Sequence, residues 1–385
     1  MFLEPLRGDN HAAVLAAALQ IRLEGGVPLI GDERWSQEQW RGLLAEATQR
    51  ELPEHAAWAG FTSGSTGSPR IVIRSHESWA CSFKAITRLL EARPGDAILI
   101  PVHPVSSMAL YAAAHAQETG LRFVVPQTHR LRAEDLDGPD FMHGTPWHLR
   151  EVLGLIQNGA RCTLRAILIG GDRLDNQVAM HARQLGLQVV SYAGAAELSF
   201  IAVDAGTGLR AFPGVELSVD DDGTLWARSA QLCSAIVGNG SSLRTAPAVE
   251  AQTSTEVWGT VGDRATLSNG VLTLHGRADD AILTAGATVL PHDVETILNG
   301  LPGVKASLVV AAPDQVLGQR VVAFIESELG AQLDRRTLLR RARAQLTPAQ
   351  YPRSLRLVTF LPRTGPGKVR RLSYADAQQL MDQAP

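Results

Sequence analysis

The sequence lacks several features that mark specialised classes of protein. None of its 385 residues fall in an apolar run of 18, so no transmembrane helix is expected, and its start does not resemble a secretory signal. The three cysteines, Cys81, Cys162 and Cys233, are isolated, which suggests a reducing compartment without disulfides or a cysteine-based metal cluster. The net charge of −3 provides no field that would attract nucleic acid or an anionic membrane. We therefore expect a cytoplasmic globular protein.

The central part of the chain alternates between two kinds of segment. Short apolar runs that predict buried strands cover residues 96–102, 121–126, 164–171 and 187–194. Segments with helical periodicity lie between them, at 108–117, 147–159 and 175–186. This alternation predicts an α/β fold whose sheet is mostly parallel and covered on both faces.

The pattern changes after about residue 210. Short strands with Asp-Gly and Asn-Gly turns continue to residue 276 and predict a β-rich subdomain. The remaining sequence predicts a compact α+β unit. We therefore expect a large N-terminal α/β domain over residues 1–277 and a small C-terminal domain over residues 278–385.

The segment TSGSTGSPR (62–70) carries no bulky side chain before Arg70. Gly64 and Gly67 permit positive φ and a close approach of the backbone. The backbone N–H groups could form a nest for phosphate oxygens, and Arg70 would add a fixed positive charge. Hydroxyl groups for the same purpose come from Thr62, Ser63, Ser65 and Thr66. The segment is not a GxxxxGK[ST] loop, and read alone it is also compatible with a solvated turn.

Five segments in order resemble the adenylate-forming (AMP-binding) superfamily of acyl- and aryl-CoA synthetases, luciferases and peptide-synthetase adenylation domains. Residues 62–70 are similar to its phosphate-binding signature, and GGD (170–172) to its adenine-flanking turn. AGAAE (193–197) is similar to its YGxTE element. Residues 260–295 are similar to its TGD…GRxDDxIKxxGxxVxPxEIE block, and PRTGPGKVRR (362–371) to its PxTxxGKxxR element.

The resemblance implies that a carboxylate attacks the α-phosphorus of ATP to give acyl-AMP and pyrophosphate, after which CoA takes the acyl group. Two anions must meet, so the site needs cations and aligned dipoles. Lys368 stands at the position of the adenylation lysine, which bridges the carboxylate and the α-phosphate. Residues 62–70 would hold the β- and γ-phosphates. Glu197 would coordinate Mg²⁺ through a carboxylate oxygen, the ligand that this cation prefers.

The same resemblance implies the contacts of the nucleoside. Asp263 would accept hydrogen bonds from both ribose hydroxyls, and Arg277 would assist it. The residues implied to lie around the adenine are Gly171, Asp172, Tyr192, Ala193 and Gly194. Tyr192 stands one place before the stacking tyrosine of the superfamily, so a tyrosine of the core is an equally good interpretation.

Asp279 falls at the hinge of the superfamily, where the small domain rotates between the two half-reactions. That rotation would make the small domain mobile, withdraw Lys368 and bring the loop around Gly286 to the thiol acceptor. An ordinary turn is the alternative for Asp279. His103 could lie near the acyl pocket, but Ser107 fits that register too, and a histidine with its partners satisfied is the better interpretation.

The chain departs from the superfamily at several points. Arg70 replaces a lysine, Ala196 a threonine and Leu283 another lysine. Only about 60 residues precede the phosphate segment, far fewer than relatives usually have, so the N-terminal region must be shortened or rebuilt. The acyl pocket and the acceptor stay open for this reason, and a homodimer is one way to complete them.

Three functions are compatible with these residues. The first is an ATP-dependent acid–thiol ligase that makes an acyl- or aryl-CoA. The second transfers the acyl group to the phosphopantetheine of a carrier protein, and the absence of an FDxS aspartate near 103–115 disfavours an amino-acid substrate. The third is a nucleotide-binding protein without ligase activity, against which the presence of Lys368, Glu197 and Asp263 argues.

Overall fold

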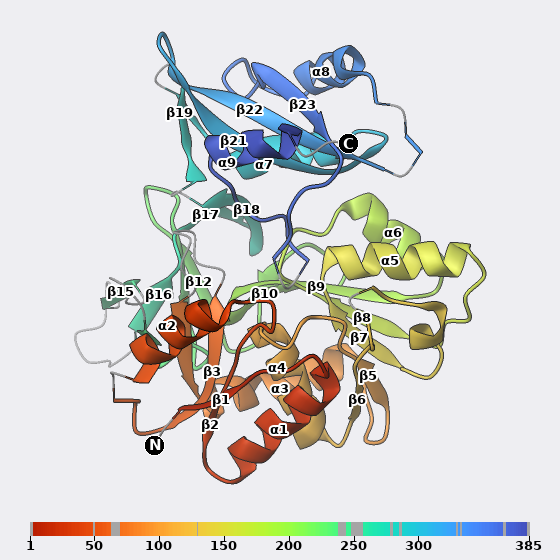
Figure 1. Cartoon of the computed structure of the whole chain (residues 1–385), viewed down its shortest axis with the longest axis vertical. Helices are drawn as coiled ribbons and strands as arrows, with labels where there is room; N and C mark the ends of the chain where they lie inside the picture. The colour runs from red at the N-terminus through yellow and green to blue at the C-terminus, as the bar shows by residue number, and fades with distance from the viewer. Residues whose placement is uncertain are drawn as a thin grey trace.

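The computed structural model describes residues 3–48, 51–62, 70–128, 130–237, 244–247, 257–277, 280–284, 287–328, 330–331, 333–364 and 367–382. The chain forms a large N-terminal α/β domain with a small C-terminal domain stacked on it (Figure 1). This arrangement confirms the predicted fold class. In the described part of the chain, no helix is both long and apolar enough to span a bilayer.

The central sheet of the large domain is mostly parallel. In spatial order its strands are β11 (Arg210–Ala211), β10 (Ser199–Asp204), β9 (Gln188–Ala195), β8 (Ala166–Ile169), β7 (Phe141–Gly144), β5 (Ala97–Leu99) and β6 (Arg122–Val124). Only β10 and β11 run antiparallel to their neighbours. Alternate residues of β8 enter two separate cores, Leu168 on one face and Ile167 on the other. Burial on both faces explains why these strands appear as uninterrupted apolar runs.

Helices cover both faces of this sheet. On one face lie α5 (Pro146–Gln157) and α6 (Asn176–Gln184), with the short 3₁₀ helix η1 (Ala133–Leu136) beside α5. On the other face lie α3 (Glu77–Leu89) and α4 (Ser107–Thr119). Every residue of α4 from Ala109 to Ala116 is buried. Its alanines let α4 pack closely between the central sheet and a second sheet.

The second sheet is built largely from the N-terminal residues. Its strands, in spatial order, are β1 (Leu3–Leu6), β2 (Val27–Ile30), β3 (Ala56–Thr62), β4 (Arg70–Ser75) and β14 (Ala235–Val237). The first three strands are parallel and are connected through α1 (His11–Leu23) and α2 (Gln37–Thr48). The first 62 residues therefore form a compact βαβαβ unit that packs on α4 through α1.

Residues 216–277 form the β-rich part that the hairpin turns predicted. One sheet contains β12 (Glu216–Val219), β13 (Leu225–Arg228), β16 (Val257–Thr260) and β15 (Arg244–Pro247). A separate hairpin joins β17 (Asp263–Ser268) to β18 (Val271–Arg277). Its turn residues Asn269 and Gly270 have φ of 51° and 74°, as a two-residue hairpin with a right-handed twist requires.

The C-terminal domain has its own sheet and its own cores. The strands are β20 (Ala287–Val289), β19 (Ile282–Thr284), β22 (Gly318–Ser327), β21 (Val304–Asp314) and β23 (Ser354–Val358). Its helices are α7 (Pro291–Asn299), α8 (Arg335–Arg343) and α9 (Tyr374–Asp382). Alternate residues of β22 supply two clusters, one on each face of the sheet. The boundary at 277/278 stays a prediction, because residues 278 and 279 lie outside the described part.

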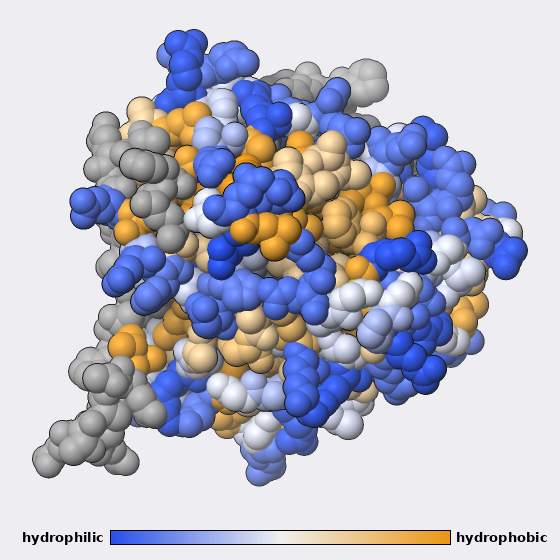
Figure 2. Space-filling model, turned by 90° about the horizontal axis from the view of Figure 1, so that it is seen from below, coloured by the Kyte–Doolittle hydropathy of each residue, from blue (hydrophilic) through white to orange (hydrophobic). Residues whose placement is uncertain are grey.

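The face of the large domain opposite the small domain is mixed in polarity. Figure 2 shows apolar patches there that are interrupted by polar side chains. Among exposed apolar residues, Leu23 at the end of α1 has 69% of its surface accessible. The expectation of a homodimer stays a prediction.

Candidate active site

The sequence-predicted residues gather where parallel strands end. Thr62 ends β3, Gly170 follows β8, and Glu197 follows β9 in the turn before β10. A parallel bridge between Phe61 and Ser106 joins the end of β3 to the start of α4, so the strand ends of the two sheets adjoin. Open α/β sheets bind their ligands at this edge.

A strand pair flanks the residues that were predicted to bind phosphate. Thr62 and Arg70 are direct partners in the antiparallel ladder of β3 and β4. The residues between them that were predicted to bind phosphate lie outside the described part, and their role stays a prediction: Ser63, Gly64, Ser65, Thr66 and Gly67.

An ion pair joins Arg70 to Glu197, two residues that the sequence assigned to the same phosphates. Arg70 Nη2 lies 3.1 Å from Glu197 Oε1, although the residues are 127 positions apart. Glu197 is only 3% exposed, so its carboxylate is largely shielded from water beside this cation. No hydrogen bond or ion pair from the side chain of a described residue reaches its second carboxylate oxygen. A buried carboxylate with one oxygen to offer fits the hard-ligand chemistry of Mg²⁺.

Sequence reasoning missed Arg74, which fixes the turn that carries Glu197. Arg74 Nε and Nη2 donate to the carbonyl oxygen of Ala196 at 3.0 and 2.8 Å, and Nη1 donates to that of Gln231 at 2.6 Å. Burial lowers the pKa of Arg74 to about 10, so it remains charged at neutral pH. The sequence feature that could have identified Arg74 is its spacing from Arg70, because residues four apart lie on the same face of a strand.

The turn expected to flank the adenine is tightly packed. A Cβ atom on Gly170 would lie 2.1 Å from Tyr192 Cζ, so the tyrosine ring sits directly against this backbone. The Tyr192 hydroxyl also lies 3.0 Å from His143 Nε2, and its ring centroid is 4.4 Å from that of Phe200. Tyr192 is therefore partly buried and packs against the core, and a contact with the adenine stays a prediction.

The neighbouring positions line the same turn. Gly171 has φ of +82°, and a Cβ atom there would lie 3.3 Å from Met108 Cε at the start of α4. Ala193 is buried, and a Cβ atom on Gly194 would lie 2.1 Å from the carbonyl oxygen of Ser199, so only glycine fits. Asp172 is exposed on the side that faces the C-terminal domain.

The residues assigned to the ribose and the hinge are partly described. Asp263 and Arg277 are direct partners in the ladder of β17 and β18, which places their backbones side by side. The Arg277 side chain, Asp279 and Gly286 lie outside the described part, so their roles stay predictions.

Lys368 belongs to a tight hairpin of the C-terminal domain that reaches the large domain. The Thr364 N–H donates to the carbonyl oxygen of Lys368 at 2.8 Å, and Arg363 bridges to Val369. Beside it, a Cβ atom on Gly367 would lie 3.2 Å from Trp147 Cε3. Trp147 is in the first turn of α5, directly after β7. Figure 1 shows this dark-blue segment descending to the strand-end edge.

Two buried carboxylates hold the hairpin within its own domain. Glu295 on α7 accepts from Arg371 Nη2 at 2.8 Å, and Asp280 lies 3.7 Å from Arg371 Nε. Glu326 on β22 accepts from Arg363 Nη2 at 3.0 Å. Lys368 itself is exposed. The lysine is thus presented to solvent on a rigid support that is clamped on both sides.

Comparisons with known proteins agree with this geometry. The model of the AMP-binding enzyme family matches residues 9–229, and that of the AMP-binding enzyme C-terminal domain matches residues 293–368. The chain belongs to the AMP-binding enzyme family. This confirms the superfamily that the five motifs indicated and the expectation of an enzyme.

Relatives of this AMP-binding enzyme extend over nearly its whole length. A Mycobacterium tuberculosis protein named "Probable 2-succinylbenzoate--CoA ligase" is 30% identical, with 94% of each chain covered. The fatty acid–[acyl-carrier-protein] ligase ScoC of Streptomyces coeruleorubidus is 28% identical over 82% of this chain and 66% of its own. The o-succinylbenzoate CoA synthetase of Bacillus subtilis, solved with ATP and magnesium, has a TM-score of 0.79 at 19% identity and covers 99% and 89%.

Proposed function

We propose that this AMP-binding enzyme joins a carboxylic acid to the thiol of CoA in two steps. In the first, the carboxylate attacks the α-phosphorus of ATP, and pyrophosphate leaves. In the second, the thiol of CoA attacks the acyl carbon, and AMP leaves. The observation that carries the proposal is the position of the Lys368 hairpin, seated on Trp147 at the edge that also holds Arg70 and Glu197.

Each charged residue has a distinct task in the first step. Lys368 donates to the incoming carboxylate and the α-phosphate together, so it holds two anions at reacting distance and stabilises the charge that develops between them. Arg70 adds a fixed positive charge where β- and γ-phosphates would lie. Glu197 would hold Mg²⁺, which supplies further charge neutralisation when bound. Asp263 would orient the ribose.

The second step requires Lys368 to leave. Its hairpin is fixed to α7 and β22 by the Glu295 and Glu326 contacts, so it moves with the C-terminal domain as one body. Rotation about the region of Asp279 would remove the lysine and admit the thiol, with the loop around Gly286 near the acceptor. The domain boundary and this motion are part of the proposal.

The second candidate function transfers the acyl group to a carrier-protein phosphopantetheine. It is favoured by the likeness to the Streptomyces coeruleorubidus ligase, whose name specifies that acceptor. The chemistry of the first step is the same for both acceptors, so the residues above serve either.

Pyrophosphate exchange tests the proposal. The enzyme is supplied with ATP, Mg²⁺ and single acids from a panel that spans aliphatic and aromatic carboxylic acids, among them fatty acids and 2-succinylbenzoate. Exchange driven by one class of acid supports adenylation. If no acid in the panel drives exchange, the result indicates a nucleotide-binding protein without ligase activity. CoA and a phosphopantetheinylated carrier protein are then offered to the productive acid, and the thioester formed identifies the acceptor.

A further inference from the structure

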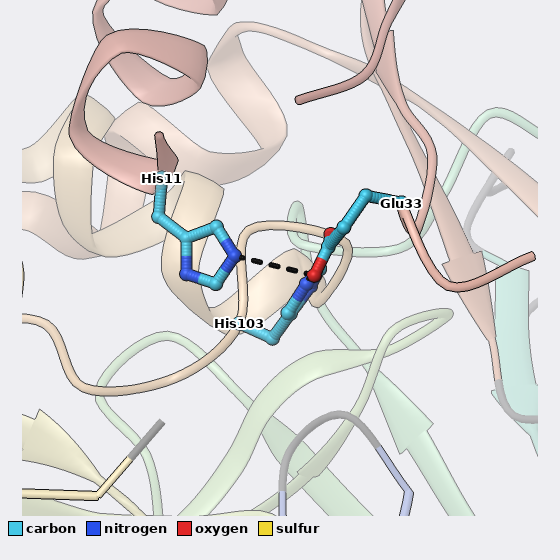
Figure 3. Close-up of side chains that lie close together, drawn as sticks. All are labelled: His11, Glu33 and His103. Atoms are coloured by element: carbon cyan, nitrogen blue, oxygen red, sulfur yellow. Dashed lines mark hydrogen bonds and ion pairs between the residues drawn. The ribbon is translucent and has the colours of Figure 1, made fainter. Parts of the chain in front are cut away.

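Three ionisable side chains from distant segments converge, among them His103, to which the sequence assigned no catalytic role (Figure 3). His11 begins α1, Glu33 lies in the loop after β2, and His103 lies in the segment after β5. One ligand atom from each lies within 4.8 Å of the other two. We propose that these side chains form a binding site for a divalent transition-metal ion, with Zn²⁺ as the ion that fits best.

The donor set selects among metals. Two imidazole nitrogens and one carboxylate oxygen are ligands that Zn²⁺ accepts, with a fourth position left for water or another ligand. Mg²⁺ and Ca²⁺ prefer ligand sets made only of oxygen. The site is therefore distinct in chemistry from the Mg²⁺ position proposed at Glu197.

The separations of the ligand atoms suit a small tetrahedral ion. Zn²⁺ bonds of 2.0–2.1 Å place neighbouring ligand atoms about 3.3 Å apart. His103 Nε2 lies 2.8 Å from Glu33 Oε2, and His11 Nε2 lies 3.6 Å from Glu33 Oε1. The two imidazole rings meet edge to face, with centroids 4.4 Å apart and planes at 71°. The ring edges thus turn toward one carboxylate, and separations of up to 4.8 Å would have to shrink toward the tetrahedral value when an ion binds.

The surroundings fix the position of the His103 ring and show what would change when an ion binds. His103 is 5% exposed, so its ring is held within the fold. The Val105 N–H donates to His103 Nδ1 at 3.1 Å, which places the ring proton on Nε2 toward Glu33. The ion would take the place of that proton, and Nδ1 would become protonated and give up the Val105 bond. Asp32 adds negative charge, although Arg34 Nε holds it at 2.7 Å.

Such an ion would join three segments that the chain otherwise connects over 92 residues, from His11 to His103. It would clamp α1 and the loop after β2 onto the segment that leads into α4. A ligand that binds only the folded chain raises its stability. Zn²⁺ should therefore raise the melting temperature of the whole protein.

The test uses the full chain, stripped of metal with a chelator and free of nucleotide. Zn²⁺ is titrated in competition with a chromophoric chelator, and Co²⁺ is titrated separately to record its visible absorption bands. We expect one Zn²⁺ per chain and Co²⁺ bands typical of nitrogen and oxygen ligation. Glu33→Gln and His11→Gln should each weaken Zn²⁺ binding about tenfold or more and abolish the rise in melting temperature.

His76→Gln is the matched control. His76 and Glu118 form a similar pair, with Nε2 and Oε1 2.8 Å apart, but the described residues offer them no third ligand. This variant should bind Zn²⁺ like the wild type. Failure of the wild type to bind one equivalent would overturn the proposal, and so would unchanged binding in both Glu33→Gln and His11→Gln. Melting curves without metal show whether the variants are folded. Because the two substitutions lie in different segments, the test still works if one of the variants does not fold.

Discussion

The two domains present their cations in opposite ways. Arg70, in the large domain, is half-buried and held by the buried Glu197, whose turn is in turn fixed by Arg74. Lys368, in the small domain, is exposed at the tip of a hairpin whose base is held by Glu295 and Glu326. A cation that binds the β- and γ-phosphates of ATP does not block the thiol, so it can be built into a core. In the proposed two-step reaction, the cation that must make way for the thiol is carried on a body that can leave.

The largest expected effect is that acid pH lowers the stability of the large domain much more than that of the small domain. His115, His143 and His148 are buried in the large domain, and burial lowers their pKa values to about 4, 3 and 3. In the unfolded chain their pKa is about 6.5. Their contribution is thus present above pH 6.5 and is lost as pH falls toward 4, at up to about 1.4 kcal/mol per pH unit for each.

Denaturant unfolding at pH 7.5 and pH 5 checks this, with tryptophan fluorescence as the probe. All seven tryptophans precede residue 259, so their emission reports the large domain. The small domain has a single histidine, His292, and no tryptophan, so its unfolding is followed by circular dichroism, and it should lose much less stability. If both domains lost the same stability between pH 7.5 and pH 5, the predicted effect of the buried histidines would be wrong.

The second prediction concerns the exposed cation. Lys368→Ala should lower pyrophosphate exchange about 100- to 1000-fold, because one donor to developing charge is lost. Thioester formation from a supplied acyl-adenylate should be little affected. Arg370→Ala, which removes another exposed cation of the same hairpin, is the control and should retain exchange. Undiminished exchange in Lys368→Ala would refute the proposed role.

The third prediction concerns the support beneath the fixed cation. Arg74→Met should leave the carbonyl oxygens of Ala196 and Gln231 without their donor, at a cost of about 1–3 kcal/mol each in stability. Exchange should fall about tenfold, with a higher Mg²⁺ concentration needed for half-maximal rate, because Glu197 is no longer positioned. A purely structural role would lower stability and leave the Mg²⁺ dependence unchanged. Arg74→Lys should restore part of both.

The smallest effect is expected where charge is kept and geometry is changed. Arg70→Lys should alter exchange only about threefold, because an ammonium can still reach the phosphates, although it cannot match the planar guanidinium. The KM for ATP is the measurement. Arg70→Met should raise this KM far more, and an equal effect of the two substitutions would mean that charge at this position is unimportant.

The sequence located four strands of the central sheet, missed β7, β10 and β11, and located none in the first 60 residues. Strands buried on both faces are continuous apolar runs, so β8 and β9 could be located to within a few residues. By contrast, β1 has only four residues, one of them a proline, and its character comes from pairing with β2. Such a strand is specified by its partner rather than by its own pattern.

The candidate site shows the same division. Glu197, Asp263 and Lys368 lie in segments whose spacing is distinctive, so their roles could be predicted without coordinates, and those roles stay predictions. Arg74 and Trp147 could not, because their importance depends on contacts with residues 122 and 220 positions away. Tertiary packing decides the role of such residues.

The contact between Arg173 Nη1 and Thr296 Oγ1, 3.3 Å apart, has a practical consequence. It crosses from the loop after β8 to α7, so a covalent link between these two positions would tether the C-terminal domain, which carries Lys368, to the strand-end edge of the large domain. An enzyme locked in this way should stop after a single half-reaction and retain its product. It would then be a reagent for trapping and identifying the natural acid from a cell extract.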